Sequence, residues 1–403
     1  MATTPIINAQ LDALNAKLEA QNHLIAHQNA AIDLLASDKR ATLTSNLELL
    51  VELIQNGELH EELDYGDQIS MAWADGSTNY NPALNFCHLE TSVLEDAEQI
   101  PTAIFEWDKC LPFATAFMNP QALFESATEL AAGTYHFTVA NATADSGDNG
   151  KTYQFTLDSA IPAGGQIRKT NSATASISAA GALKVYASAS TTEATATLTV
   201  TEGNGGTDLG TTDGSGDLNH FSRINYGHNR WMTSDIRQFL NSDAAAGAWW
   251  SKQEKWAVKP AYADTKDGFL HGYSADIIRH MRVTKIQTAA NNVTDGGVTD
   301  VTYDRVFLRS LEQSYISPQV SGIEGDYWEY YKRLLGRTSP ASTGQTYTRL
   351  IKRRLDNNNA VACWMRSAYR GYANTVWSVY SSGYVSSSSA SSGLYCAPAC
   401  KIG

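Results

Sequence analysis

The stretch Arg366-Ser-Ala-Tyr-Arg-Gly-Tyr-Ala-Asn-Thr-Val-Trp-Ser-Val-Tyr-Ser-Ser-Gly-Tyr-Val-Ser-Ser-Ser-Ser-Ala-Ser-Ser-Gly-Leu-Tyr-Cys396 decides how the rest of the sequence is interpreted. About half of its residues are Ser or Tyr, and its only charge after Arg366 is Arg370. A disordered Ser-rich tail is one interpretation of this composition. A folded segment is favoured because Ser382-Gly383 lies between two alternating runs, as a hairpin turn would. Apolar anchors also recur, at Val376, Trp377, Val379 and Val385.

The chemistry of this stretch is that of a binding surface rather than of a catalytic site. Tyr offers a large amphipathic contact area with little rotamer entropy to lose, while Ser and Asn adapt their hydrogen bonds. Such a surface can recognise many shapes and performs no obvious chemistry of its own. We therefore expect a displayed ligand-binding surface between about Trp364 and Gly403.

The sequence from Asn219 onward predicts a scaffold of α+β type. Thr233 or Ser234 is expected to cap a helix that runs to about Asn241, and a second helix should end before Gly336. A buried strand is predicted at 306–308, a short helix at 311–315 and a closing strand at 397–402. Large aromatic anchors concentrate in this part, at Trp231, Trp249, Trp250, Trp256, Trp328, Trp364 and Trp377.

The region 119–206 differs from its surroundings, because its composition shifts toward Thr, Ala, Ser and Gly. Runs with period two predict strands in a small antiparallel, sandwich-like module. These runs lie at 133–139, 151–157, 182–187 and 194–200. Residues 61–118 hold earlier strands. The module is either an insertion into a C-terminal domain that includes 61–118, or part of an independent N-terminal β domain spanning both.

The first 60 residues predict helices. Apolar or seam residues alternate spacings of four and three, which is the period of a left-handed coiled coil. They are Ile7, Leu11, Leu14, Leu18, Gln21, Ile25, Gln28, Ile32 and Leu35. Docking of one amphipathic helix on its own domain is the alternative. We expect oligomerisation, as a parallel trimer. A second helix is expected from about Ala41 to Leu59, with Gly57 near its end.

Composition narrows the function classes. The net charge of −12 without basic clusters argues against nucleic acid and against an anionic membrane as the main partner. The run Lys352-Arg353-Arg354 is interpreted as a solvated helix face. No apolar run is long enough to span a membrane, and the first residues show no signal peptide, so we expect synthesis in a cytoplasm. Five scattered cysteines are expected to be buried thiols.

The C-terminal half resembles the variable proteins of diversity-generating retroelements, in particular tail receptor-binding proteins of phages and prophages. The resemblance rests on Asn229-Arg-Trp231, Phe307-Leu-Arg-Ser310, Trp364-Met-Arg-Ser-Ala368 and the stretch quoted above. It implies a C-type-lectin-like fold, related to that of formylglycine-generating enzymes. It also implies that adenine-directed mutagenesis of AAC or AAT codons rewrites the variable segment, at about 364–395.

The resemblance also implies which residues contact a ligand. The expected ligand-binding residues are Tyr369, Tyr372, Asn374, Thr375, Ser378, Tyr380, Ser382, Tyr384, Ser386, Ser387, Ser388, Ser389, Ser391, Ser392, Leu394 and Tyr395. The unmutated framework would be Ala368, Gly371, Ala373, Val376, Trp377, Val379, Gly383, Val385 and Ala390. No calcium signature of sugar-binding lectins is visible. We expect no catalytic residue, no metal and no cofactor.

The combined prediction is an α+β protein with four segments. These are an N-terminal α-helical coiled coil for oligomerisation (1–60), early strands assigned to the lectin-like domain (61–118), an all-β, sandwich-like module acting as a spacer (119–206) and a C-type-lectin-like ligand-binding domain (207–403). The predicted function is a phage tail adhesin in the virion. It would bind a host cell-surface receptor, either protein or glycan, and other tail proteins through its N-terminus. The alternatives are a structural tail or baseplate component without a ligand, and a formylglycine-generating-type oxidase.

Overall fold

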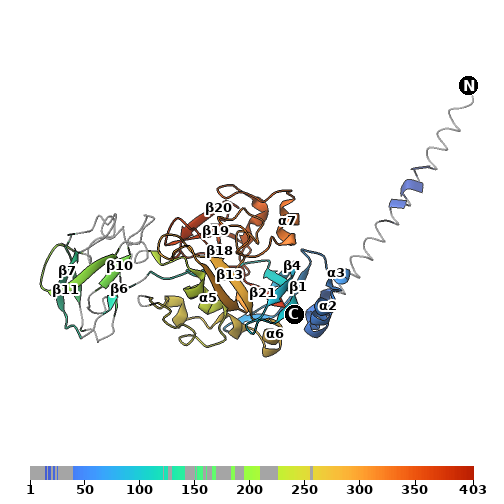
Figure 1. Ribbon diagram of the computed structural model, residues 1–403. Helices are drawn as coiled ribbons and strands as arrows, with labels where there is room; N and C mark the ends of the chain where they lie inside the picture. Colours follow the sequence, from blue (N-terminus) through green and yellow to red (C-terminus); the bar gives the residue numbers. More distant parts are fainter. Residues whose placement is uncertain are drawn as a thin grey trace, which may run out of the picture.

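The chain adopts a mixed helix-and-sheet fold in a computed structural model, which confirms the α+β class (Figure 1). The structure describes residues 14–15, 17–19, 21–22, 25, 40–120, 122–125, 129–140, 150, 152–157, 160, 166–168, 183–186, 195–208, 226–254 and 257–403. One hydrophobic core joins residues as far apart in sequence as Leu43 and Ile402. Among the described residues, no helix is long and apolar enough to cross a membrane.

The N-terminal part contains one helix that packs on the body and one that does not. The described residues between 14 and 25 are helical, and Leu14, Leu18 and Ile25 are more than half exposed. Gln21 is also described, whereas five predicted seam residues lie outside the described residues. These are Ile7, Leu11, Gln28, Ile32 and Leu35. By contrast, helix α2 (Leu47–Asn56) buries its apolar face, and α3 (Leu59–Glu62) follows it. Residues from Leu43 onward therefore belong to the body, and the segment boundary expected at residue 60 moves toward residue 40.

The main sheet combines the first and last strands of the body. Its five strands lie in the order β1-β4-β5-β21-β15, and the central β5–β21 pair is antiparallel. The strands are β1 (Gln68–Ser70), β4 (Ala83–Val93), β5 (Gln99–Trp107), β21 (Ala399–Ile402) and β15 (Val306–Phe307). A hairpin of β2 (Trp73–Asp75) and β3 (Thr78–Tyr80) precedes β4. The predicted closing strand and buried strand are both confirmed. Because β4 and β5 share this sheet with β21, the β module is inserted between parts of one domain.

The inserted module contains all four predicted strands. Together with the short strand β12, these four form a five-stranded sheet in the order β10-β11-β7-β8-β12. Within this sheet only β12 runs parallel to its neighbour. The strands are β7 (Gly133–Ala140), β8 (Thr152–Leu157), β10 (Leu183–Tyr186), β11 (Thr195–Glu202) and β12 (Thr207–Asp208). A second sheet pairs β6 (Ala122–Glu125) with β9 (Gln166–Arg168). The module lies at the opposite end of the body from α2, so it cannot separate the N-terminal helix from the body as the spacer role requires (Figure 1).

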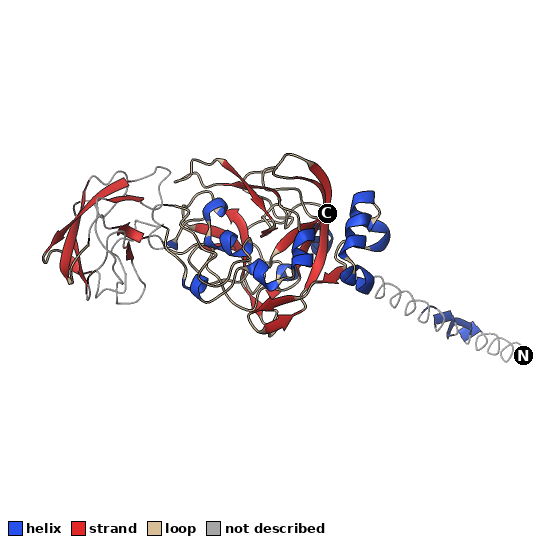
Figure 2. Cartoon of the chain, turned by 90° about the horizontal axis from the view of Figure 1, so that it is seen from below, coloured by secondary structure: helices blue, strands red, loops and turns tan. Residues whose placement is uncertain are grey.

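Short helices cover the body between the module and α2 (Figure 2). They are η1 (Trp231–Thr233), α5 (Asp235–Leu240), η2 (Ala261–Asp264), η3 (Phe269–Gly272), α6 (Ala275–His280), α7 (Glu329–Leu335) and η4 (Thr348–Leu350). Local signals predicted two of them correctly: Ser234 caps α5, and Gly336 ends α7 with φ 61°. The short helix expected at 311–315 is a hydrogen-bonded turn instead, and it ends where Tyr315 takes φ 56°.

Small antiparallel sheets complete the body. Strand β13 (Thr284–Ala289) pairs with β14 (Thr299–Asp304), and β16 (Lys352–Arg353) pairs with β17 (Ala360–Val361). A three-stranded sheet consists of β18 (Cys363–Ala368), β19 (Thr375–Val379) and β20 (Val385–Ser389). The basic run at 352–354 is therefore not a solvated helix face. Lys352 is buried, and its Nζ donates to Glu106 Oε2 over 3.0 Å and to the Trp107 carbonyl over 2.8 Å.

Candidate ligand-binding surface

The hairpin β19–β20 presents the centre of the predicted variable segment. The Tyr380 N–H donates to the Tyr384 carbonyl over 2.9 Å, and the Gly383 N–H donates to the Tyr380 carbonyl over 2.8 Å. Gly383 has φ 84°, and a Cβ there would lie 2.5 Å from the Tyr347 carbonyl oxygen. Only glycine fits this position without strain. The turn predicted at Ser382-Gly383 is thus confirmed.

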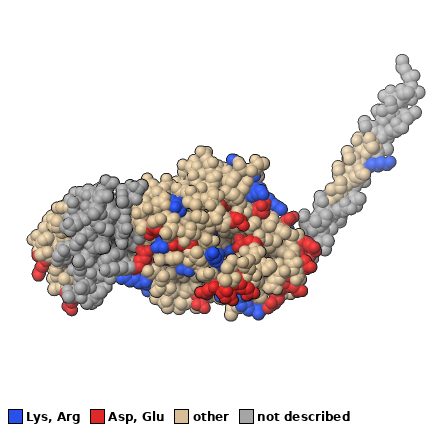
Figure 3. All heavy atoms as spheres, in the orientation of Figure 1, with Lys and Arg blue, Asp and Glu red and all other residues tan. Residues whose placement is uncertain are grey.

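Three tyrosines are the most exposed large side chains of the segment. Tyr372 is 46% exposed, Tyr380 36% and Tyr384 37%. The rings of Tyr380 and Tyr384 lie 6.1 Å apart across the hairpin, and Ser382 is exposed between them. The surface over β18–β20 is mostly uncharged (Figure 3). We refer to Tyr372, Tyr380, Ser382 and Tyr384 together as the tyrosine face: Tyr372 lies in the loop before β19, and the other three lie at the turn that follows it.

Nine other predicted contact residues are half-buried. They are Tyr369, Thr375, Ser386, Ser387, Ser388, Ser389, Ser391, Ser392 and Tyr395. Tyr369 supports Tyr372, because its ring lies 5.1 Å from the Tyr372 ring and 5.2 Å from the Trp377 ring. These residues keep part of their surface available to a ligand, while their packing fixes the position of the exposed rings.

Three predicted contact residues are buried, so they are removed from the candidate surface. Asn374 is 7% exposed, Ser378 0% and Leu394 7%. Ser378 lies on the central strand of its sheet, where its Oγ donates to the Ser386 carbonyl over 3.3 Å. The backbone of Leu394 bonds to Thr115, and the carbonyl of Asn374 accepts from Ala390. These three residues are packed inside the body, so a ligand cannot reach them while the sheet is folded.

The expected framework residues lie beneath the face. Ala368, Ala373, Val376, Trp377, Val379, Gly383, Val385 and Ala390 are buried, whereas Gly371 is exposed. Trp377 closes the core under the loop at 369–374, and its Nε1–H donates to Gln319 Oε1 over 3.3 Å. Buried apolar side chains therefore alternate along the segment with polar ones that reach the surface.

Asn229 is a supporting residue whose role the sequence did not reveal. Its side chain is fully buried, and its Nδ2 donates to the carbonyls of Tyr369, Tyr372 and Thr375 over 3.2, 2.8 and 2.8 Å. One amide thus holds both sides of the loop that carries Tyr372. The resemblance identified Asn229 as part of a motif, but three acceptors from a loop 140 residues away leave no local signal.

A buried charged cluster stiffens the body below β18. Glu106 Oε1 accepts from Arg309 Nη1 over 2.6 Å, Oε2 accepts from Lys352, and the Tyr331 hydroxyl donates to the same oxygen. Burial raises the pKa of Glu106, but the charges of Arg309 and Lys352 outweigh burial and hold the pKa below its usual value. The carboxylate stays ionised and fixed, which fits a structural role.

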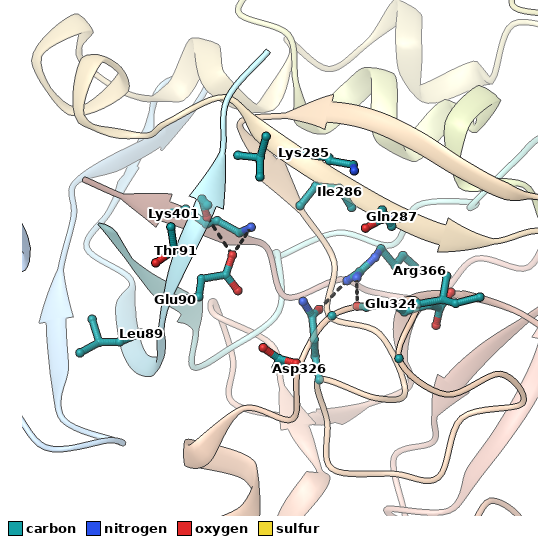
Figure 4. Close-up of a pocket in the computed structure, with 16 residues that line it drawn as sticks. Leu89, Glu90, Thr91, Lys285, Ile286, Gln287, Glu324, Asp326, Arg366 and Lys401 are labelled. Atoms are coloured by element: carbon teal, nitrogen blue, oxygen red, sulfur yellow. Dashed lines mark hydrogen bonds and ion pairs between the residues drawn. The ribbon is translucent and has the colours of Figure 1, made fainter. Parts of the chain in front are cut away.

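A separate pocket of about 530 Å³ opens between β4, β13 and the loop at 322–326 (Figure 4). Lys401 pairs with Glu90 over 2.6 Å on one side. On the other side, Arg366 donates to the carbonyls of Leu308 and Glu324. None of the predicted contact residues lines this pocket. Because no residue of the tyrosine face lines it, the pocket is distinct from that face.

The cysteines offer no accessible nucleophile. All five are free and buried, as the sequence predicted. Burial raises the pKa of the Cys396 thiol well above its usual value and that of Cys400 to about 12. A hydrogen bond with Cys110 lowers the pKa of Cys363 to about 7, yet Cys363 is 0% exposed. Among the described residues, no three His, Cys, Asp or Glu side chains are grouped as metal ligands.

Comparison with known proteins finds one family match, over slightly less than half of the chain, and no activity. Residues 211–403 match the family described as "Domain of unknown function (DUF6273)". The match covers the β18–β20 sheet and the closing strand, and it excludes β1–β5 and the inserted module. No curated protein and no solved structure matches the chain.

Proposed function

We propose that this chain is a phage tail receptor-binding protein that contacts the host cell surface through its tyrosine face. The observation that carries the proposal is the exposure of Tyr372, Tyr380 and Tyr384 above a buried apolar framework. Tyr is enriched at binding hot spots, and it gives affinity without requiring charge. A Ser-rich structural end without a ligand would have no reason to display these rings.

The proposal includes diversification by a retroelement on a C-type-lectin-like scaffold. Its support is that all expected ligand-binding positions except Asn374, Ser378 and Leu394 reach the surface at least in part, whereas all expected framework positions except Gly371 are buried. The nucleotide sequence provides a direct check. We expect a near-identical copy of the codons for 364–395 beside a reverse transcriptase gene, with AAC or AAT at the positions of exposed Tyr and Ser. AAC and AAT codons concentrated at the buried framework would contradict diversification.

The first testable prediction concerns the paired hairpin tyrosines. Tyr380→Ala with Tyr384→Ala should reduce adsorption of the protein to intact bacteria by about thirtyfold or more, since truncating a binding hot spot costs about 2 kcal/mol or more. Adsorption is measured with fluorescently labelled protein on a panel of bacterial species. The melting temperature should stay unchanged, because both rings are exposed.

Tyr303→Ala is the matched control, because Tyr303 is a half-buried tyrosine on β14 outside the hairpin. It should leave adsorption unchanged. If the double variant unfolds at a clearly lower temperature, the hairpin tyrosines are structural and the binding role fails. If the double variant binds every species as well as the unsubstituted chain does, the structural-component alternative is favoured instead. No observation favours the oxidase, whose two expected cysteines are buried with raised thiol pKa values.

A further inference from the structure

Charge is distributed unevenly around the tyrosine face. Every charged residue from Arg337 through Arg354 and from Arg366 through Lys401 is Lys or Arg, although the whole chain carries a net charge of −12. These two ranges contain the hairpin β19–β20 and the loop packed against it. Lys352, Arg366 and Lys401 are buried, and Arg354 pairs with Asp356. The cations of these ranges that reach the surface without an acidic partner among the described residues are Arg337, Arg349, Arg353 and Arg370.

The loop at 342–348 continues the tyrosine face. The Gly344 N–H donates to the Val385 carbonyl, and the Val385 N–H returns a bond to the Gln345 carbonyl, both over 2.9 Å. The Tyr347 N–H donates to the Gly383 carbonyl over 2.8 Å. Gln345 and Thr346 are exposed next to Tyr384. A ligand on Tyr384 would thus also meet this loop.

Two arginines border the same loop. The Arg337 guanidinium lies 5.8 Å from the centre of the Tyr347 ring, and Arg349 donates to the Leu334 carbonyl over 2.6 Å. Both are exposed, and neither has an acidic partner among the described residues. Neighbouring cations differ in this respect: Lys332 pairs with Glu329, and Arg354 pairs with Asp356. Arg337 and Arg349 thus keep a positive charge that the protein does not neutralise.

We propose that the tyrosine face binds an anionic cell-surface glycan, whose carboxylate or phosphate groups are held by Arg337 and Arg349. The inference rests on the proposed function and narrows its ligand class. Guanidinium groups match carboxylates and phosphates geometrically, and exposed cations raise the rate of encounter with an anionic partner. Tyrosine rings present apolar area with a hydroxyl, and Ser and Thr hydroxyls bond to polar groups, which suits a hydroxylated sugar chain.

The test uses an array of bacterial glycans in three groups: neutral, carboxylated and phosphorylated. The unsubstituted chain should bind preferentially to the charged groups. Arg337→Ala with Arg349→Ala should weaken that binding by about tenfold at roughly 0.05 M salt, with a smaller loss at about 0.5 M, where screening is strong. Arg337→Glu with Arg349→Glu should weaken it further. A purely structural role for the arginines would give the same loss in both variants.

The control is Arg282→Ala with Lys285→Ala, which removes the same charge outside the hairpin and the 342–348 loop. Both control side chains are half-buried, and neither has an acidic partner among the residues that the structure describes. It should leave binding unchanged. Binding only to neutral glycans, or to none, would overturn the inference. So would loss of adsorption to bacteria after protease treatment, which would indicate an acidic protein. If Tyr380→Ala with Tyr384→Ala loses binding while the Glu variant keeps it, the charge inference fails and the proposed function stands. If the tyrosine variant binds unchanged, the proposed function fails.

Discussion

At the scale of single residues, Asp235 is an ionisable group placed where its charge is costly. It is fully buried at the start of α5. Its two oxygens accept from the Asn119 N–H over 2.7 Å and from Trp250 Nε1 over 2.6 Å. Burial outweighs both hydrogen bonds and raises the pKa of Asp235 from 3.8 to about 7. Asp235 is therefore protonated in mildly acidic solution while the rest of its surroundings stay unchanged.

This raised pKa predicts a pH-dependent stability. Because the folded state holds the proton more tightly than the unfolded state, the stabilisation is complete below about pH 4 and is lost as pH rises to about 7. The loss amounts to at most about 4 kcal/mol, at 1.36 kcal/mol per pH unit. Asp235→Asn should remove this slope, although the amide will satisfy only one of the two donors. Urea unfolding at several pH values between 4 and 8 checks it, and parallel curves for the two proteins would contradict the assignment.

At the scale of elements, the loop at 369–375 depends on one side chain from another segment. Asn229 Nδ2 bonds to three of its carbonyls, and Asn229 Oδ1 accepts from Asn291 Nδ2 over 2.8 Å. Asn229→Ala would remove the side-chain donor of the Tyr372 carbonyl, while the carbonyls of Tyr369 and Thr375 keep backbone donors. We expect the substitution to cost about 1–3 kcal/mol of stability. Hydrogen exchange at Tyr369–Thr375 should accelerate, while exchange in the hairpin β19–β20 stays slow.

Asn241 provides the matched control, because its side chain also bridges backbone groups, at Arg305 and Val306. Asn241→Ala should lower stability without changing exchange at 369–375. Equal acceleration throughout the body in both variants would mean that Asn229 acts through global stability and not on the loop that carries Tyr372.

Elements with local signals were predictable from the sequence, and long-range pairings were not. Gly57 ends α2 as expected, and its N–H bonds to carbonyls three and four positions earlier. Asn46, which caps the start of α2, lies inside the range in which one continuous helix from Ala41 was expected. The misinterpreted Lys352 bonds to Glu106, 246 residues away, so its neighbours in sequence suggested a solvated cation. Ser378 and Ser386 are the same residue type in one hairpin, yet only Ser378 is fully buried. That difference comes from strand order, because β19 lies between β18 and β20.

At the scale of the whole molecule, the inserted module and helix α2 lie at different ends of the body (Figure 1). The module departs after Met118 and returns before Tyr226, and both residues bond to the end of the variable segment. The Met118 N–H donates to the Ala390 carbonyl over 3.0 Å, and the Ser391 N–H donates to the Tyr226 carbonyl over 2.9 Å. The module therefore adjoins the candidate surface. Helix α2, the first helix that packs on the body, lies at the opposite end (Figure 1).

This arrangement suits a molecule held at one end and binding at the other, and it makes oligomerisation through the N-terminal helix testable. Leu14, Leu18 and Ile25 expose an apolar stripe at coiled-coil spacing. We expect the full chain to sediment at about three times its 43.8 kDa mass, and a chain starting at residue 40 to be a folded monomer, since Leu43, Leu47 and Leu50 remain to cover the body. Leu14→Asp with Leu18→Asp in the full chain should also give monomers.

The monomer should bind each site equally well but dissociate faster from bacteria, because avidity is lost. A full chain that is monomeric at micromolar concentration would show that the stripe serves another partner.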